Sequence, residues 1–99
     1  MKQLRRDKVL EILREHKAEL ADRYGVISLG IFGSVARDEA KADSDVDIIV
    51  KLEKPGLFAL AHLREELMSI LECDVDLVHE SQYMRPFLRN KIDLEGIMV

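Results

Sequence analysis

Two aspartates, Asp45 and Asp47, stand at the start of an apolar segment, residues 46–52, that is predicted as a β-strand. Residues two apart in a strand point to the same side of the sheet, so both carboxylates should share one face. Two unit charges about 4 Å apart at an effective dielectric near 20 repel by about 4 kcal/mol. A divalent cation between them would remove that repulsion, and hard cations such as Mg²⁺ prefer carboxylate oxygens. The pair therefore predicts a metal site.

A glycine-serine turn, Gly33 and Ser34, precedes this pair, and ten residues separate Ser34 from Asp45. The apolar run of residues 26–32 is predicted as a strand that leads into the turn, and one short helical turn follows it. Glycine lets the backbone approach a ligand closely, and the N–H groups of a following helical turn favour anions. The turn thus predicts a phosphate-binding backbone beside the metal pair, and the two together predict a site for metal-bound polyphosphate.

The apolar spacing in the rest of the chain predicts alternating helices and strands. Helices are expected at residues 4–24, 57–71 and from Pro86 to near Gly96, and strands at residues 74–78 and 97–99. In the first strand, Ile27, Leu29 and Ile31 are expected on one face. The leucines of the second helix, starting with Leu57, are expected in the core. This order indicates an α/β or α+β fold with one layer of helices against a small sheet.

Composition limits the class of protein. The chain has 99 residues, of which 47% are hydrophobic and 34% charged, as expected for one soluble globular domain. No apolar stretch approaches the roughly 20 residues of a membrane span, and the N-terminus lacks a signal-peptide core. The lone Cys73 excludes an internal disulfide. We therefore predict a cytoplasmic protein without membrane contact, and the net charge of −4 argues against direct nucleic-acid binding of the usual basic kind.

Gly33-Ser34, the ten-residue interval and Asp45-Val46-Asp47 resemble the signature of the DNA polymerase β-type nucleotidyltransferase superfamily. Since Ala36, Arg37, Ser44 and Val50 also match, the pattern is similar to that of the prokaryotic minimal nucleotidyltransferases (MNT). Those small proteins are commonly antitoxins paired with a HEPN-domain ribonuclease toxin. The resemblance covers nearly the whole chain. It implies that residues 1–99 form a single minimal nucleotidyltransferase domain, with a small mixed β-sheet packed against helices.

The resemblance also implies a third carboxylate on a neighbouring strand, where the family has a segment like Val75-Asp76-Leu77-Val78. Asp76 is therefore predicted to join Asp45 and Asp47 as a catalytic and metal-binding residue. Asp74 would point the same way but stands at the start of the strand, which makes it the weaker candidate. Together the three aspartates would hold two Mg²⁺ ions, and Asp76 would accept the proton of the attacking hydroxyl.

Four residues are predicted to bind the nucleotide: Gly33, Ser34, Arg37 and Ser44. Gly33 and Ser34 would bind the β- and γ-phosphates. Arg37 would offer paired donors to phosphate oxygens, or would instead form a surface ion pair with Asp38 or Glu39. Ser44 would cap or stiffen the approach to Asp45, or would merely end the loop, and the sequence leaves these two roles equal.

The MNT resemblance implies a function as well. ATP would be the substrate, and AMP would be attached to a tyrosine of a cognate HEPN toxin, which makes the chain a protein adenylyltransferase and antitoxin. Two alternatives are a non-catalytic antitoxin that neutralises the toxin by stoichiometric binding, and a nucleotidyltransferase for small molecules, for which 99 residues leave little room. Neither the oligomeric state nor the base preference follows from the sequence.

Overall fold

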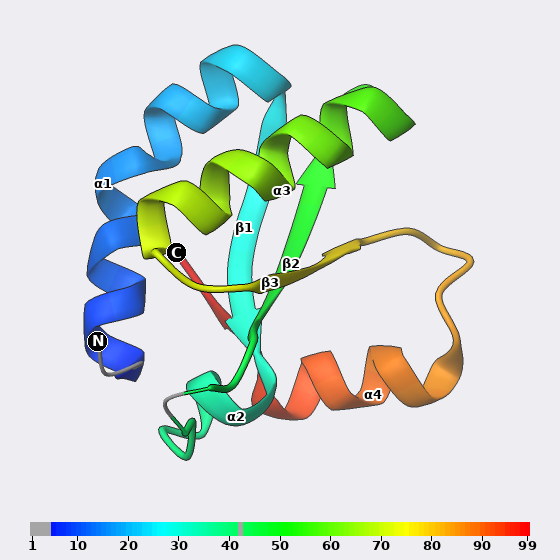
Figure 1. Cartoon of the computed structure of the whole chain (residues 1–99). Coiled ribbons are helices and arrows are strands. Elements are labelled where there is room, and N and C mark those ends of the chain that lie inside the picture. Colours follow the sequence, from blue (N-terminus) through cyan, green and yellow to red (C-terminus); the bar gives the residue numbers. More distant parts are fainter. Residues whose placement is uncertain (1–4, 42) are drawn as a thin grey trace.

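The computed structural model describes residues 5–41 and 43–99, and helices alternate with strands along it (Figure 1). The elements are α1 (Arg6–Tyr24), β1 (Val26–Phe32), α2 (Gly33–Ala36), β2 (Val46–Leu52), α3 (Leu57–Leu71), β3 (Val75–His79), α4 (Pro86–Glu95) and β4 (Ile97–Met98). Each predicted helix and strand is present, with boundaries within about two residues of the prediction. Leu4, where the first helix was expected to start, lies outside the described residues.

The four strands form one mixed sheet in the order β3-β2-β1-β4. The pairs β1–β2 and β1–β4 are antiparallel, whereas β2 and β3 are parallel. Parallel neighbours need a crossover connection, and α3 supplies it. Because β2 and β3 run in the same direction, their first residues lie at the same end of the sheet. The predicted carboxylates are at this end.

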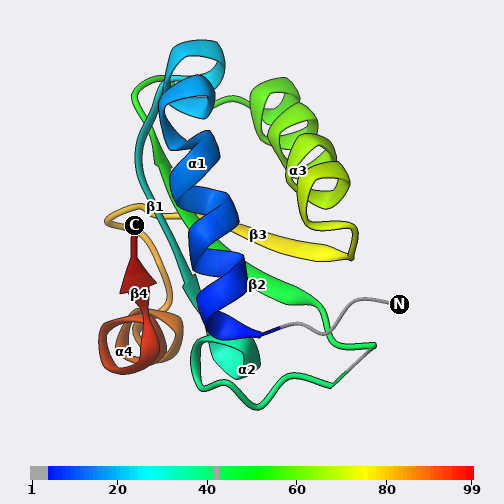
Figure 2. The same ribbon diagram turned by 90° about the vertical axis from the view of Figure 1, so that its left-hand side faces the viewer.

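Helices α1 and α3 cover one face of the sheet and lie side by side (Figure 2). Their leucines Leu13, Leu20, Leu63 and Leu67 are fully buried, each with 0% exposure, against β1 and β2. The hydroxyl of Tyr24 at the end of α1 donates a hydrogen bond to Glu66 of α3 over 2.9 Å. Within the described residues, no helix has both the length and the apolar character needed to cross a bilayer.

Helix α4 packs on the opposite face of the sheet, so the expectation of a single helical layer was wrong. Its buried residue Ile92 contacts Phe32 of β1 and Ile49 of β2 in a second, smaller core. Phe32 and Ile49 give the two central strands apolar side chains on both faces at this point, and the second face needs a cover of its own. The fold is nevertheless the predicted mixed α/β arrangement, with a small sheet between helices.

Two apolar residues depart from the sequence prediction, which placed Ile27 on one face with Leu29 and Ile31 and placed Leu57 in the core. Val26 pairs with Leu52 and Ser28 with Lys51, so Ile27 is an extra residue that forms a β-bulge. The bulge shifts the alternation by one residue, which leaves Ile27 54% exposed and places Val26 in the core at 6% exposure. Leu57, the first residue of α3, is 86% exposed.

Candidate active site

The three predicted aspartates lie at the end of the sheet where β2 and β3 begin. Asp47 and Asp76 are partners in the parallel ladder, so they lie on neighbouring strands at the same height. Asp45 lies two residues before Asp47, just ahead of β2. The intervening Val46 and the following Ile48 are completely buried under α1 and α3. The alternation of the strand therefore directs the side chain of Asp47 to the other face, where α4 packs.

The charges in this group act on one another. Partial burial raises the pKa of Asp47, and the negative charges of Asp76 and Asp45 raise it further. The positive charges of Lys91 and Arg37 act in the opposite direction. A carboxylate in such a setting is costly to ionise and favours a compensating cation.

Gly33 gives the backbone its close approach to Asp47. Its φ angle is +73°, in the left-handed region that glycine tolerates and other residues rarely adopt. A Cβ atom at this position would lie 2.1 Å from the Oδ2 atom of Asp47. Phe32, the residue before Gly33, is the cross-strand partner of Asp47. The turn and the carboxylate predicted to work together are therefore in direct contact, and only glycine fits between them.

The donor set suits a hard divalent cation, because it consists of carboxylate oxygens that share a face and repel one another. Within the described part of the chain, no group of three or more His, Cys, Asp or Glu side chains is already arranged to hold a metal ion. Asp45 and Asp76 are exposed, so their side chains are not held in place by packing. The three carboxylates thus fit Mg²⁺ chemically, and the side chains would have to change rotamer to bring their oxygens around the ion.

Arg37 is engaged in ion pairs in this structure. Its Nε donates to Glu39 over 2.6 Å, and its Nη1 donates to both carboxylate oxygens of Glu95 in α4. The pair with Glu39 is one of the alternatives that the sequence left open. Binding of phosphate by Arg37 stays a prediction, and it would compete with these two glutamates for the same donors.

Ser44, directly before Asp45, makes two hydrogen bonds with the backbone of Lys41. Its Oγ accepts a hydrogen bond from the backbone N–H of Lys41 over 2.9 Å, and its own N–H donates to the carbonyl of Lys41 over 3.0 Å. Of the two structural roles that the sequence left equal, the stiffening one agrees with this reciprocal pair. A direct contact of Ser44 with the nucleotide stays a prediction.

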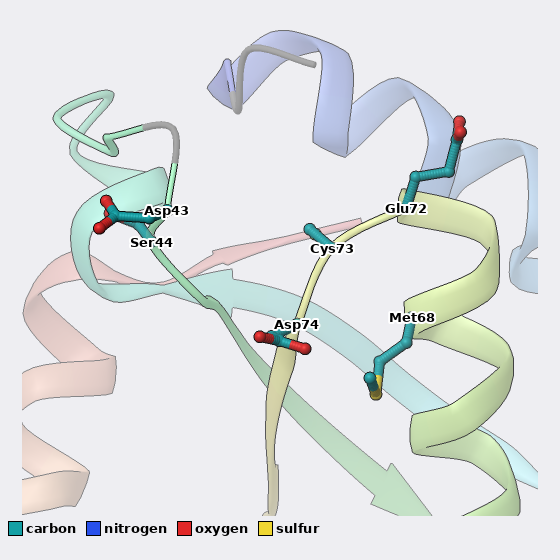
Figure 3. A pocket seen from close by; sticks show the side chains of 6 residues that line it. All are labelled: Asp43, Ser44, Met68, Glu72, Cys73 and Asp74. Carbon is teal, nitrogen blue, oxygen red and sulfur yellow. The ribbon is translucent and has the colours of Figure 1, made fainter. Parts of the chain in front are cut away.

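A pocket of about 390 Å³ opens where the segments that lead into β2 and β3 meet α3 (Figure 3), and Asp45, Asp47 and Asp76 are not among its lining residues. Its lining residues are Asp43, Ser44, Met68, Glu72, Cys73 and Asp74. Met68 belongs to α3, whereas Ser44 and Asp74 precede β2 and β3. Asp74, the weaker candidate for the third ligand, thus faces this pocket, and Asp76 is the residue paired with Asp47.

Lys91 was missed by the sequence reasoning. It is a half-buried residue of α4, and its positive charge acts on Asp47. The available signal was its position directly before Ile92 in a helix with an apolar face, which places a long cationic side chain at the border of a packed surface.

The family described as nucleotidyltransferase domain matches residues 13–99. The chain belongs to this family. A relative from Thermococcus cleftensis, named protein adenylyltransferase MntA, is 46% identical over 82 residues, which cover 82% of this chain and 83% of the relative.

Solved structures show the same fold. A structure provisionally named a minimal nucleotidyltransferase has 37% identity and a TM-score of 0.75, and the match covers 91% of this chain and 92% of that one. A second match has 25% identity and a TM-score of 0.59 and covers 99% of this chain and 71% of the other. That structure is a tri-AMPylated HEPN toxin of Shewanella oneidensis in complex with an MNT antitoxin. The MNT resemblance inferred from the sequence is thereby confirmed.

Proposed function

We propose that this protein is a Mg²⁺-dependent protein adenylyltransferase of the cytoplasm that transfers AMP from ATP to a tyrosine of a HEPN-domain toxin and so acts as its antitoxin. Residues 1–99 would act as one minimal domain. The observation that carries the proposal is the pairing of Asp47 with Asp76 on parallel strands, in contact with the Gly33 turn. The adenylyltransferase name of the T. cleftensis relative and the AMPylated toxin of the S. oneidensis complex support the choice of donor and acceptor.

Each predicted site residue would have its own role in the transfer of AMP. The backbone at Gly33 and Ser34 would bind the β- and γ-phosphates, and Asp45, Asp47 and Asp76 would hold two Mg²⁺ ions. When bound, the metal would neutralise phosphate charge and lower the pKa of the attacking hydroxyl. Asp76 would accept the proton of the tyrosine hydroxyl while the tyrosine oxygen forms a bond to the α-phosphorus of ATP and the bond from that phosphorus to pyrophosphate breaks. The exposed position of Asp76 on the edge strand β3 leaves it accessible to a protein acceptor.

The test is to incubate the purified protein with ATP, Mg²⁺ and a cognate HEPN-domain toxin. Mass spectrometry of the HEPN protein should show AMP on a tyrosine, and its ribonuclease activity should fall. Asp45→Asn, Asp47→Asn and Asp76→Asn should each abolish both effects. If the mass of the partner does not change and Asp47→Asn still neutralises the toxin, the catalytic proposal is wrong.

The dose separates catalysis from stoichiometric binding. A catalyst neutralises the toxin at far below one copy per toxin molecule, whereas a binding antitoxin needs about one copy each. The ribonuclease assay should therefore be run over a range of ratios, with ATP and without it. Neutralisation that requires equimolar protein and ignores ATP would favour the binding alternative.

A further inference from the structure

Helix α4, which carries Lys91, packs on the face of the sheet toward which Asp47 points. Ile92 packs on Ile49 of β2, and Ile49 lies two residues after Asp47, on the same face of that strand. Lys91 directly precedes Ile92 in the helix and is half-buried. The charge of Lys91 is close enough to Asp47 to act on the pKa of its carboxyl.

An ion pair fixes this placement. Glu95, one helical turn after Lys91, accepts hydrogen bonds from the guanidinium of Arg37. Arg37 directly follows α2, the short helix that begins at Gly33. The side of α4 that carries Lys91 and Glu95 is therefore tied to the segment with the phosphate-binding turn. A shift of α4 along the sheet would break the ion pair and move Lys91 away from Asp47.

Lys91 and Arg37 differ in their partners. Arg37 is paired with Glu39 and Glu95. The side chain of Lys91, within the described residues, makes no hydrogen bond or ion pair, although its charge acts on Asp47. An ammonium group offers three donors and no acceptor, and charge-assisted bonds to phosphate oxygens are among the strongest that a side chain makes. An ammonium without such bonds, at the border of the predicted polyphosphate site, has its donors available for the ligand.

We propose that Lys91 binds a phosphate oxygen of the nucleotide, and that the ion pair between Arg37 and Glu95 positions α4 for this contact. The inference rests on the proposed function, because it assumes a nucleotide triphosphate at the Gly33 turn. It assigns to α4 a direct role in substrate binding in addition to its packing role.

The test compares Lys91→Met with Lys91→Arg and with the matched control Lys54→Met. Lys54 is exposed and follows the far end of β2, seven residues after Asp47. Calorimetry with Mg²⁺ and AMP-PNP measures affinity for the triphosphate, and adenosine serves as the ligand without phosphate. Lys91→Met should weaken AMP-PNP binding by about tenfold or more, because a charged hydrogen bond is lost. Its affinity for adenosine and its melting temperature without ligand should stay near those of the wild type, Lys91→Arg should restore part of the loss, and Lys54→Met should behave as the wild type.

Each outcome bears on one proposal or both. If Lys91→Met binds AMP-PNP as tightly as the wild type does, or loses affinity for adenosine equally, Lys91 is not a phosphate ligand. If it loses affinity only together with its thermal stability, its role is structural and the inference is overturned. A wild type that binds AMP-PNP through Lys91 but never modifies a HEPN protein would refute the proposed function and leave the assignment of Lys91 standing. A wild type that binds no AMP-PNP would refute both.

Discussion

Replacing Gly33 with alanine should damage the fold and the site for two separable reasons. The φ angle of Gly33 is +73°, and a residue with a Cβ atom in the left-handed region costs about 1–2 kcal/mol. The new Cβ would also lie 2.1 Å from the Oδ2 atom of Asp47, so the carboxylate or the turn must move. The first effect lowers the free energy of unfolding. The second lowers it further and displaces a carboxylate that the proposed mechanism needs.

The chain offers a control for each effect. Gly25 also has a positive φ, +69°, but an added Cβ would meet its nearest neighbour, Glu53, at an ordinary 3.6 Å. Gly25→Ala therefore reports the backbone strain alone, about 1–2 kcal/mol. Gly56 has an extended backbone and nothing within 4 Å of an added Cβ. Gly56→Ala has neither strain nor clash, so its cost should be limited to the loss of a favourable N-cap residue, no more than about 1 kcal/mol.

Thermal and urea unfolding of the three variants give the free energies, and for a chain of this size 1 kcal/mol corresponds to roughly 4–8 °C in the melting temperature. The expected order of stability is Gly56→Ala, then Gly25→Ala, then Gly33→Ala. Nucleotide binding should fail in Gly33→Ala and persist in Gly25→Ala. If Gly33→Ala is as stable as Gly25→Ala and still binds AMP-PNP with the affinity of the wild type, the account of a glycine required by close approach to Asp47 is refuted.

Burial and the charge of Asp76 raise the pKa of Asp47, so the native state holds this proton more tightly than the unfolded chain does. The protonated carboxyl of Asp47 therefore stabilises the native state at acidic pH, and this contribution is lost as the pH rises through the raised pKa. Without metal, Asp47→Asn should be more stable than the wild type at neutral pH, and the difference should shrink in acid. Mg²⁺ should raise the melting temperature of the wild type and have less effect on Asp47→Asn, as differential scanning fluorimetry would show. Glu95→Gln should weaken AMP-PNP binding as Arg37→Met does if their ion pair positions α4, whereas a loss confined to Arg37→Met would indicate that Arg37 binds phosphate itself. Ile48→Ala, in the main core, should cost about 2–5 kcal/mol by urea unfolding.

The elements of this fold could be predicted because their signals are local. β1 spans residues 26–32 and α3 spans residues 57–71, as the sequence predicted. Glycines mark these boundaries: Gly25 ends α1 in the left-handed conformation, Gly33 begins α2, and Gly56 caps α3. The meeting of Asp47 with Asp76 followed from the family pattern, because periodicity alone does not say which strands are neighbours.

The features that escaped prediction depend on contacts between distant segments. The bulge at Ile27 arises from the register between β1 and β2. The alternation of apolar residues within one strand does not reveal that register. The pairing of Arg37 with Glu95 joins residues 58 positions apart. The position of Lys91 depends on which face of the sheet α4 covers. The sequence of a short amphipathic helix does not indicate which face of a sheet the helix will cover. Sequence reasoning could therefore find the acidic half of the site and the existence of α4, but not the placement of α4 at the border of the site.

The two faces of β2 explain why a fold of this size can carry a group of repelling carboxylates. Val46, Ile48 and Val50 are each completely buried on the side of α1 and α3, and Asp47 points to the other side. The core thus supplies stability without contacting the charges, and the charges can be altered without opening a cavity. A substitution at Asp47 should remove function and preserve the fold, whereas one at Ile48 should weaken the fold and, through it, the site. Because of the same separation, the metal-free protein holds several carboxylates close together, and Asp47 among them is costly to ionise. Binding of a cation would relieve a repulsion already present in the native state.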